Sequence, residues 1–547
     1  MPTVTFNKDV FEKLVGKKLP LNQLKDRISM LGTDLEGIEG NEITVEIFPD
    51  RPDMLSEQGF ARAFSSFIGV NTGLAGFDVK KSGTHVKVEK TLKIWPHVVT
   101  AIVKGLKFDD EKVREMIQLQ EKLGVTLCRD RKKGGIGIYP LDKVSPPVIF
   151  TTEKPEKIRF RPLEFPRELT GRQILSQHPT GRKYADIMAD QDEFPIFVDS
   201  KGIIMSMPPI INSHDVGKIT SDTRDVFIEA TGPHLNTLLV ALNIIVTSMA
   251  DMGGKIFSLD IIRGKEKMTT PDLSPSTMKL SLEYANNRLG LELKQNEIKK
   301  LLEKMGYSYS KGEVLVPAYR ADVIHPCDLV EDLAIAYGYE NFKEEIPSVS
   351  TIGSEEPFTV FRRKVSGILV GLGLIELNTY HLTDRESQCS RMQADMDMVE
   401  LSNALTAEYS SLRTWMIPSI LKVMADNKHN EYPQKIFDIG TIFKKSIGTE
   451  TGIEENERLA VGITSENADF TGIKQILDYL IRMLDLEYEI QPVEHPSFIP
   501  GRVGRVTVNK KKVAYIGEIS PQVLSAWDLQ MPVSCFELNL TDLFNAV

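Results

Sequence analysis

The densest group of acidic side chains lies in the segment YRADVIHPCDLVEDLAIAYGY, residues 319–339. Asp328, Glu331 and Asp332 have the i, i+3 and i+4 spacing of neighbours on one helical face. Asp322 lies just upstream, where we expect a strand to end. Carboxylate oxygens are the ligands that a hard cation such as Mg²⁺ prefers, so this spacing allows a metal site. The opposite face is expected to belong to the core and carries Leu329, Val330, Leu333 and Ala336.

The same acidic residues also fit an interpretation without a metal. Asp328 and Glu331 have the spacing of a capping box, and acidic residues stabilise the first turn of a helix. Like-charge repulsion on one face favours a cation or a basic partner. The residues alone leave both interpretations open.

A second polar group follows two consecutive prolines in SMPPIINSHDVGKITSDTRDVFIEATG, residues 206–232. Glu229 and Thr231 stand two apart in a predicted strand and therefore face the same side. With Ser206 and Asn212 nearby in the sequence, they predict a small polar pocket. The alternative is a polar strand face with an Asx turn, because no nucleophile and base are aligned here.

Common catalytic and ligand-binding signatures are absent from the sequence. It contains no GxxxxGK[ST], HExxH or GxSxG motif and no strand followed by GxGxxG. The fragment GLGLIE near Gly371 is predicted to end a helix. His381 and His495 are expected to be structural, and the four cysteines, which form no CxxC pair, are expected to be reduced and buried.

The size and composition predict a multidomain globular protein. The chain has 547 residues, with 41% hydrophobic and 26% charged residues, which is too long for a single core. Its net charge of −10 argues against nonspecific coating of nucleic acid, although basic residues could cluster locally. The first residues lack the apolar run of a secretory signal and no later segment has the length of a membrane span, so we expect a cytoplasmic protein.

The helices and strands that we predict around these side chains indicate an α+β multidomain chain. Residues 1–78 combine two glycine-terminated helices with a strand and a third helix. Residues 85–265 are rich in strands, including a hairpin that turns at Gly202, and form an α+β domain in the middle of the chain. Residues 270–346 form a small domain with the acidic cluster. Residues 355–547 predict a mainly antiparallel sheet backed by helices.

The order of these segments resembles phenylalanyl-tRNA synthetase beta subunits of the archaeal and eukaryotic cytosolic type, over essentially the whole chain. The segments that carry the resemblance are FPDRPDMLSEQGFARA, HPTGRKYADIMAD, SMPPIINS, YRADVIHPCDLVEDLAIAYGYENF and SSLRTWMIPSILKVMADN. The resemblance implies an N-terminal module, a central B3/B4-type editing domain, a B5-type small domain and a C-terminal domain like a class II synthetase core. It also implies an alpha subunit as partner in an alpha2beta2 tetramer, and tRNA(Phe) as a ligand.

In this family the C-terminal domain is catalytically silent. The sequence agrees, because Arg413 is followed by Thr414 and Trp415 where an active class II strand has an arginine, one residue and then a glutamate. No GxGxxxR occurs near the C-terminus. The resemblance therefore implies that ATP and phenylalanine are activated on the alpha chain.

The resemblance also assigns expected roles to the two polar groups. The central domain is expected to hydrolyse tyrosine wrongly attached to tRNA(Phe), because a hydroxyl is hard to reject from an apolar pocket. Glu229 is the expected contact of the tyrosine hydroxyl, and Ser206, Asn212 and Thr231 are expected to line the pocket or position water. Mg²⁺ is expected at Asp322, Asp328, Glu331 and Asp332, near the contact with the alpha chain.

Two other classes of function remain open. The first is a non-catalytic scaffold that docks tRNA and has an inactive editing domain. The second is a complete synthetase or a freestanding deacylase that acts without a partner. The missing class II arginines argue against a complete synthetase, and the large C-terminal domain argues against a freestanding deacylase.

Overall fold

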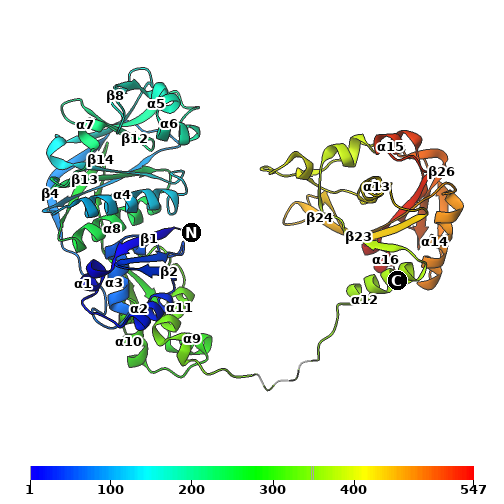
Figure 1. Cartoon of the computed structure of the whole chain (residues 1–547), viewed down its shortest axis with the longest axis horizontal. Coiled ribbons are helices and arrows are strands. Elements are labelled where there is room, and N and C mark those ends of the chain that lie inside the picture. Colours follow the sequence, from blue (N-terminus) through cyan, green and yellow to red (C-terminus); the bar gives the residue numbers. More distant parts are fainter. Residues whose placement is uncertain (1, 347, 349, 351, 547) are drawn as a thin grey trace. The chain divides into compact units, whose positions relative to one another are not determined.

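The computed structural model of the chain describes residues 2–346, 348, 350 and 352–546. The chain divides into two compact units, Met1–Ile346 and Pro347–Val547, and hydrophobic cores form within each. Figure 1 shows the first unit in blue to green and the second in green to red. Within the described residues, no helix is both long enough and apolar enough to cross a membrane.

The first unit begins with a small antiparallel sheet in the order β1-β3-β2, covered by helices. Its elements are β1 (Thr3–Asn7), α1 (Lys8–Val15), α2 (Leu21–Met30), β2 (Asp34–Glu39), β3 (Glu42–Glu46) and α3 (Glu57–Phe67). The Asn7 side chain caps α1, and Gly16 ends it at a φ of 81°, which confirms the predicted glycine stop. The rings of Phe6, Phe11 and Phe60 lie within 5.7 Å of one another and form the centre of this core.

The largest sheet has ten strands and forms the middle of the first unit. Its path is β12-β11-β10-β7-β4-β14-β5-β13-β6, with β15 paired to β14. The strands are β4 (Val79–Val88), β5 (His97–Lys104), β6 (Gly135–Pro140), β7 (Val148–Glu153), β10 (Phe194–Val198), β11 (Ile204–Met207), β12 (Ile211–Asn212), β13 (Val226–Gly232), β14 (Lys255–Arg263) and β15 (Glu266–Thr270). Gly202 turns the β10–β11 hairpin at a φ of 81°, as predicted.

Two long helices separate this sheet from the N-terminal module. In Figure 1, α4 (Asp110–Val125) and α8 (Leu235–Asp251) run along the same side of the sheet. Helix α8 packs on β5 and β13 with one face and on α3 with another. Because it is buried on several sides, its sequence LNTLLVALNIIVTSMAD is apolar almost all round instead of amphipathic.

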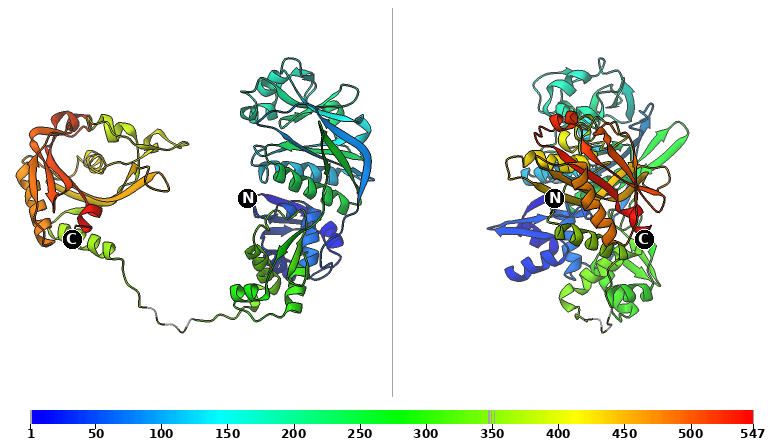
Figure 2. Two further views of the ribbon diagram at one scale, coloured as in Figure 1. Left: turned by 180° about the vertical axis from the view of Figure 1, so that it is seen from behind. Right: turned by 90° about the vertical axis from the view of Figure 1, so that its right-hand side faces the viewer.

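The ten-stranded sheet curls until its two edge strands, β6 and β12, approach each other. Tyr139 on β6 and Asn212 on β12 are joined by a hydrogen bond of 3.1 Å. Arg131, which precedes β6, donates to the carbonyls of Pro209 and Ile210 at 2.9 Å. Within the described residues no backbone ladder joins these two strands, so side chains close the seam. The left view of Figure 2 shows the sheet from behind.

A cap of short elements covers the seam end of the sheet. These elements are β8 (Arg159–Phe160), β9 (Leu169–Thr170), α5 (Gly171–Gln177), α6 (Pro179–Lys183) and α7 (His214–Gly217). Thr170 caps α5 in a capping box with Gln173. His178 caps α6 by accepting from the N–H groups of Thr180 and Gly181.

The last part of the first unit is a three-stranded sheet, in the order β16-β18-β17, with three helices. The elements are β16 (Ser276–Lys279), α9 (Leu282–Leu289), α10 (Gln295–Lys304), β17 (Ser308–Ser310), β18 (Glu313–Val316) and α11 (Pro326–Tyr337). The prediction that a strand ends at Asp322 is wrong: β18 ends at Val316, because Pro317 has no N–H to donate to a ladder. The predicted core face of α11 is confirmed, since Leu329, Val330, Leu333 and Ala336 are all buried.

The second unit is built on a seven-stranded sheet in the order β19-β23-β24-β28-β27-β26-β25. The strands are β19 (Ile375–Leu377), β23 (Gln434–Lys445), β24 (Ile453–Thr464), β25 (Glu489–Pro492), β26 (Phe498–Val508), β27 (Lys511–Ile519) and β28 (Val533–Asn539). Every pairing except β19–β23 is antiparallel, which confirms the predicted mainly antiparallel sheet.

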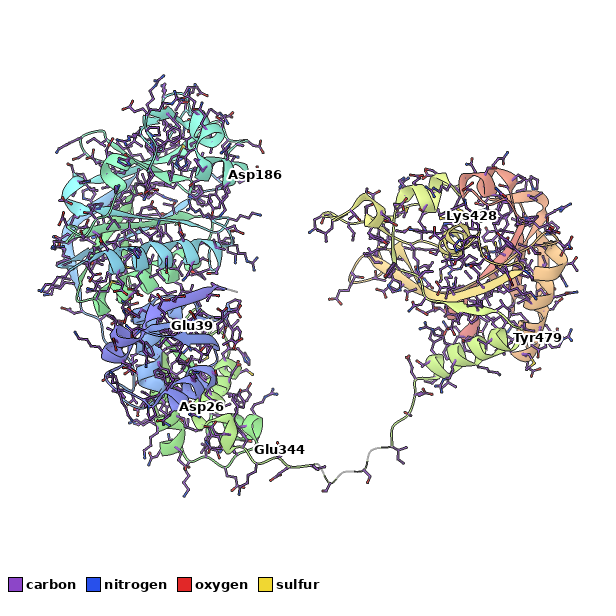
Figure 3. The ribbon with its side chains drawn as sticks, in the orientation of Figure 1. Asp26, Glu39, Asp186, Glu344, Lys428 and Tyr479 are labelled. Atoms are coloured by element: carbon purple, nitrogen blue, oxygen red, sulfur yellow. The ribbon has the colours of Figure 1, made fainter. Side chains whose placement is uncertain are left out.

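Helices cover both faces of this second sheet. The core on one face includes residues of α12 (Pro357–Gly371), α14 (Phe470–Met483) and α16 (Leu540–Phe544). The core on the other face includes residues of α13 (Ile417–Asp426) and α15 (Pro521–Ala526). Helix α12 ends at Gly371, as predicted. Figure 3 shows Tyr479 on the outer side of α14, away from the sheet.

Some predicted bounds and burials differ from the structure. The ten-stranded sheet extends beyond the predicted domain 85–265 at both ends, because β4 and β15 both pair with β14. Three of the cysteines are buried as expected, but Cys327 is exposed in the first turn of α11. The division of the first unit into three domains stays a prediction.

Candidate functional site

A cavity of about 530 Å³ lies where the curled sheet closes. Its walls come from β6, β12, α4, the Pro208–Pro209 turn and the cap, and Glu229 of β13 is one of its lining residues. Apolar lining is provided by Ile117, Ile136, Ile138, Leu163, Phe165, Ile210, Ile211 and Ile219. A mostly apolar cavity with a few fixed polar groups is the usual form of a small-molecule site.

Glu229 is the one buried carboxylate that lines this cavity among the described residues. Its side chain is 2% exposed, and Oε1 accepts a hydrogen bond of 3.0 Å from the Tyr139 hydroxyl. The other oxygen, Oε2, is buried without a partner among the described residues. Burial raises the pKa of Glu229 to about 8, although the bond from Tyr139 lowers it in part. At neutral pH this carboxyl group therefore holds a proton in most molecules.

Two glycines of β6 make room for this arrangement. A Cβ at Gly137 would meet Tyr139 Oη at 2.4 Å and Glu229 Oε1 at 2.5 Å. A Cβ at Gly135 would meet Pro209 at 2.7 Å, so this glycine lets the proline turn approach the edge strand. The alternating glycines of GGIGIYP thus allow close contact on one face of β6.

His178 also lines the cavity but is fully engaged in holding the cap. Its Nδ1 accepts from two backbone N–H groups, and Nε2 lies 3.1 Å from the carbonyl oxygen of Leu163. These partners require a neutral ring that donates through Nε2. The ring therefore positions the wall and is not free to act as a general base.

The structure brings together some of the predicted pocket residues and leaves others outside. Glu229 and Asn212 both line the cavity and share Tyr139 as hydrogen-bond partner. Ser206 is buried and pairs in register with Asn212, but it does not line the cavity. Thr231 does not line it either, because its hydroxyl accepts a hydrogen bond of 3.0 Å from Trp95 Nε1.

The acidic cluster lines a different cavity, of about 310 Å³, between α11 and the N-terminal module. All of the predicted residues line it, namely Asp322, Asp328, Glu331 and Asp332. Asp50 of the FPDRPD segment is a fifth carboxylate in the same lining. Burial raises the pKa of Glu331, and the charges of Asp332, Asp50, Asp328 and Asp322 raise it further.

A buried arginine already supplies positive charge to this cluster. Arg320 Nη2 lies 2.5 Å from Asp322 and 2.7 Å from Asp332, and Nε donates to the second oxygen of Asp322. Burial alone would lower the pKa of Arg320, but Asp332, Tyr307 and Asp322 raise it well above its usual value. Asp332 also accepts from the Tyr307 hydroxyl. Asp332 is therefore a buried residue that Arg320 and Tyr307 hold in place, and it lines the same cavity as Asp328.

The cap of α11 also differs from the expected one. Asp328 accepts from the N–H groups of Ile324 and His325, and His325 is the N-cap residue. The capping box therefore joins His325 to Asp328, and the predicted Asp328–Glu331 box is wrong, because the N-cap lies three residues earlier than that box requires. As arranged, no three His, Cys, Asp or Glu side chains in the described part of the chain converge on one metal position.

The sequence interpretation missed three residues that organise these cavities. Tyr139 orients Glu229, Asp50 joins the acidic lining, and Arg320 neutralises two of its carboxylates. The glycines that precede Tyr139 could have indicated a close approach to β6, and Arg320, two residues before Asp322, could have indicated an ion pair. Asp50 lies more than 250 residues before the cluster in sequence, and no local pattern connects the two.

Comparisons with known proteins cover both units of the chain. Residues 278–339 match the family described as the tRNA synthetase B5 domain, and residues 343–540 match the phenylalanyl tRNA synthetase beta chain CLM domain. The phenylalanine–tRNA ligase beta subunit of Pyrococcus horikoshii is 39% identical, over 100% of both chains. Those of Thermococcus gammatolerans and Archaeoglobus fulgidus are 40% and 37% identical, over 100% of this chain and 99% of theirs.

A solved structure resembles the first unit. It is the crystal structure of an N-terminal fragment of the phenylalanyl-tRNA synthetase beta subunit from Pyrococcus horikoshii. The fragment is 38% identical, has a TM-score of 0.59, and covers 61% of this chain and 99% of its own.

Proposed function

Because the chain belongs to the family of phenylalanyl-tRNA synthetase beta subunits, we propose that it is the proofreading subunit of a phenylalanine–tRNA ligase. In this proposal the chain hydrolyses tyrosine that has been wrongly attached to tRNA(Phe). The seam cavity, defined by the lining around Glu229, Asn212 and the Pro208–Pro209 turn, receives the tyrosine side chain.

The unpaired oxygen of Glu229 is the single observation that carries this proposal. A buried polar atom without a partner costs about 1–3 kcal/mol, and a phenolic hydroxyl in the cavity would relieve that cost. Phenylalanine has no hydroxyl to offer, so it would leave Oε2 unpaired. A site built to bind a hydroxyl rejects the analogue that lacks it, which is the selectivity that proofreading requires.

Residues around Glu229 hold the carboxyl group ready for this contact. Tyr139 fixes Oε1, and Asn212 fixes Tyr139 from the other side of the seam. The apolar lining excludes water from the ring of the bound amino acid. The reaction adds water across the aminoacyl ester and releases free tyrosine and intact tRNA, and Thr231 and Ser206 act behind the cavity wall as supports.

Aminoacylation belongs, in the same proposal, to an alpha subunit that activates phenylalanine with ATP. The second unit has a class II synthetase-like arrangement in this proposal, with its mainly antiparallel sheet as support. Arg413 is unavailable for nucleotide chemistry because it is buried against Asp438 and donates to the carbonyl of Thr441 and the hydroxyl of Thr379. Ile375 on edge strand β19 and Tyr380 are 65% and 77% exposed and offer apolar surface to the alpha chain in an alpha2beta2 tetramer.

We also propose that the chain binds magnesium and tRNA(Phe) and acts in the cytoplasm. The oxygen donors of the acidic cluster suit Mg²⁺ in kind, and the raised pKa of Glu331 reflects carboxylates that a cation would stabilise. Asp328 and Glu331 would hold the ion together with water, because Asp322 and Asp332 are paired with Arg320. Its contribution there is positive charge that stabilises the packing of α11.

The decisive experiment measures release of tyrosine from Tyr-tRNA(Phe) by the reconstituted complex of both subunits. We expect the wild-type complex to deacylate, Glu229→Gln to lose most of that rate, and Tyr139→Phe to lose part of it because Glu229 is no longer fixed. Glu153→Gln, an exchange of the same type at a partly exposed strand position outside the cavity, should leave the rate unchanged.

Phenylalanylation should survive all three substitutions, because the proposed reactions occupy different subunits. If the wild-type complex leaves Tyr-tRNA(Phe) intact, the proofreading proposal is wrong. The role of the chain then contracts to a scaffold that docks tRNA and supports the alpha subunit.

A further inference from the structure

The second unit contains a cavity of about 570 Å³ that the proposed proofreading reaction does not use. It lies on the face of the seven-stranded sheet that also packs against α13. Its lining residues are Met396, Asp397, Thr414, Trp415, Ile417, Lys444, Lys445, Arg458, His495, Arg505, Tyr515 and Glu537. In volume it falls within the range of small-molecule sites.

Strand register places the polar residues of this cavity in one row. Arg505 on β26 pairs with Tyr515 on β27, and Tyr515 pairs with Glu537 on β28. Glu537 pairs with Ala460 on β24, and Arg458 lies two residues from Ala460 on the same face. The row is therefore held by backbone ladders and not by a loop.

The charges in the lining leave three basic side chains without an ion pair among the described residues. Asp397 is paired with Lys445 at 2.5 Å. Glu537 Oε2 accepts from the backbone N–H groups of Met416 and Ile417, at 2.8 and 3.1 Å. No carboxylate among the described residues lies within ion-pair distance of Lys444, Arg458 or Arg505.

Two guanidinium groups also carry unused buried donors. The Nε atoms of Arg458 and Arg505 are buried and have no hydrogen-bond acceptor among the described residues. Arg505 uses one terminal nitrogen for the carbonyl of Lys512 at 3.1 Å. Buried N–H donors without acceptors are costly, so an anion that accepted from them would be bound favourably.

Aromatic rings form one wall of the same cavity. His495 lies between Trp415 and Tyr515, with ring centroids at 5.7 and 5.1 Å. The Arg505 guanidinium lies 4.1 Å from the centroid of the Tyr515 ring. Burial, together with Arg505, lowers the pKa of His495, so its ring is neutral at pH 7. Flat, uncharged rings beside cationic groups favour a ligand that has both a ring and a negative charge.

We propose that this cavity binds a nucleotide, with its phosphate near Arg458, Arg505 and Lys444 and its base against Trp415 and His495. Such a nucleotide could be a free mononucleotide or the end of an RNA strand, because both present the same base and phosphate. The site is separate from the proofreading cavity, which belongs to the other unit of the chain.

Calorimetric titration of the full-length chain with AMP tests this proposal. Adenosine and inorganic phosphate serve as probes that carry only the base or only the charge. We expect AMP to bind at least about tenfold more tightly than either probe, because charge-assisted hydrogen bonds and stacking act together. A short single-stranded RNA that ends in the same nucleotide distinguishes the two sources: tighter binding than AMP indicates an RNA end, and weaker binding indicates a free mononucleotide.

Substitutions locate the binding in this cavity. Arg458→Gln should weaken AMP binding by about tenfold or more, and the exposed Lys444→Gln by less than about fivefold. Lys511→Gln, which changes an exposed lysine outside the lining, should have no effect. Quenching of tryptophan fluorescence by AMP should disappear in Trp415→Phe, since the other two tryptophans, Trp95 and Trp527, lie outside the cavity.

Three results would overturn the proposal. The first is the absence of AMP binding to a chain whose circular dichroism shows that it is folded. The second is binding of adenosine as tight as that of AMP, which would exclude the phosphate contacts. The third is equal weakening by Lys444→Gln and Lys511→Gln, which would indicate nonspecific attraction by surface charge.

Discussion

Replacing Arg320 with methionine removes the cation that pairs with Asp322 and Asp332 while keeping much of the volume of the side chain. The side chain of Arg320 is 2% exposed, and its partners Asp322 and Asp332 are 13% and 7% exposed. After the substitution, both carboxylates stay buried without their cation, and the Tyr307 ring loses the guanidinium that lies 5.1 Å from its centroid. We expect a large loss of stability in the first unit.

The magnitude follows from burial. Removing one partner of a buried ion pair costs about 3–5 kcal/mol, because an uncompensated charge stays in the interior. An ion pair at the surface contributes only about 0–1 kcal/mol. Arg27 and Glu340 form such a pair in the same unit, at 2.7 Å and with side chains 26% and 39% exposed, so Arg27→Met is the matched control.

Urea unfolding measures both variants if the signal comes from the first unit alone. Trp95 is buried there, whereas Trp415 and Trp527 belong to the second unit, so both are replaced by phenylalanine in the background chain. Arg320→Met should lower the free energy of unfolding by about 3–5 kcal/mol, and Arg27→Met by less than about 1 kcal/mol. A loss below about 1 kcal/mol for Arg320→Met would refute the view that this arginine neutralises the cluster.

Three further predictions concern the two cavities of the first unit. The Glu229 carboxyl group keeps its proton up to about pH 8 in the folded chain but loses it near its ordinary value of 4.5 when unfolded. Between these values the folded chain binds one more proton than the unfolded chain, so the contribution of Glu229 to the free energy of unfolding falls as the pH rises. Measured by urea unfolding relative to Glu229→Gln, the free energy of unfolding should decline by up to about 1.4 kcal/mol per pH unit. If the free energies of both chains change with pH in parallel, the assignment is contradicted. Gly137→Ala should lower Tyr-tRNA(Phe) deacylation without changing phenylalanylation, because the added Cβ displaces Tyr139 and Glu229; an unchanged deacylation rate would show that their positions are not critical. Magnesium at ten times its dissociation constant should raise the free energy of unfolding of the first unit by about 1.4 kcal/mol, and an equal rise in Glu331→Gln would exclude the acidic cluster as the binding site.

Local patterns predicted the elements around both sites well. The acidic spacing of α11, its apolar face and the Gly202 turn all follow from periodicity or from the conformational freedom of glycine, and the structure confirms them. Glu229 is a candidate because it stands two residues from Thr231 in a predicted strand, and its role stays a prediction. These features depend on residues that are close in the sequence.

The features that the sequence did not predict depend on the closure of the curled sheet and on contacts between residues far apart in the sequence. Tyr139 meets Asn212 only because the ten-stranded sheet curls until its edges approach, and no local pattern encodes that curvature. Asp332 lines the same cavity as Asp328, as the spacing predicts, but its partners Arg320 and Tyr307 come from outside the helix and no helical spacing indicates them. Thr231 lies on the side of the strand that was predicted to face the pocket, but its hydroxyl accepts a hydrogen bond from Trp95 instead.

The seam between β6 and β12 is the part of the sheet that substitutions can widen or narrow without breaking a backbone ladder. Strands joined by a backbone ladder cannot be moved apart without breaking a row of hydrogen bonds, whereas this seam depends on a few side chains such as Tyr139, Asn212 and Arg131. We expect a single substitution at one of them to change the width of the cavity while the strand pairings stay intact. If the proposed proofreading function holds, substitutions at the seam change which side chain the cavity accepts without breaking the ladders that hold the sheet.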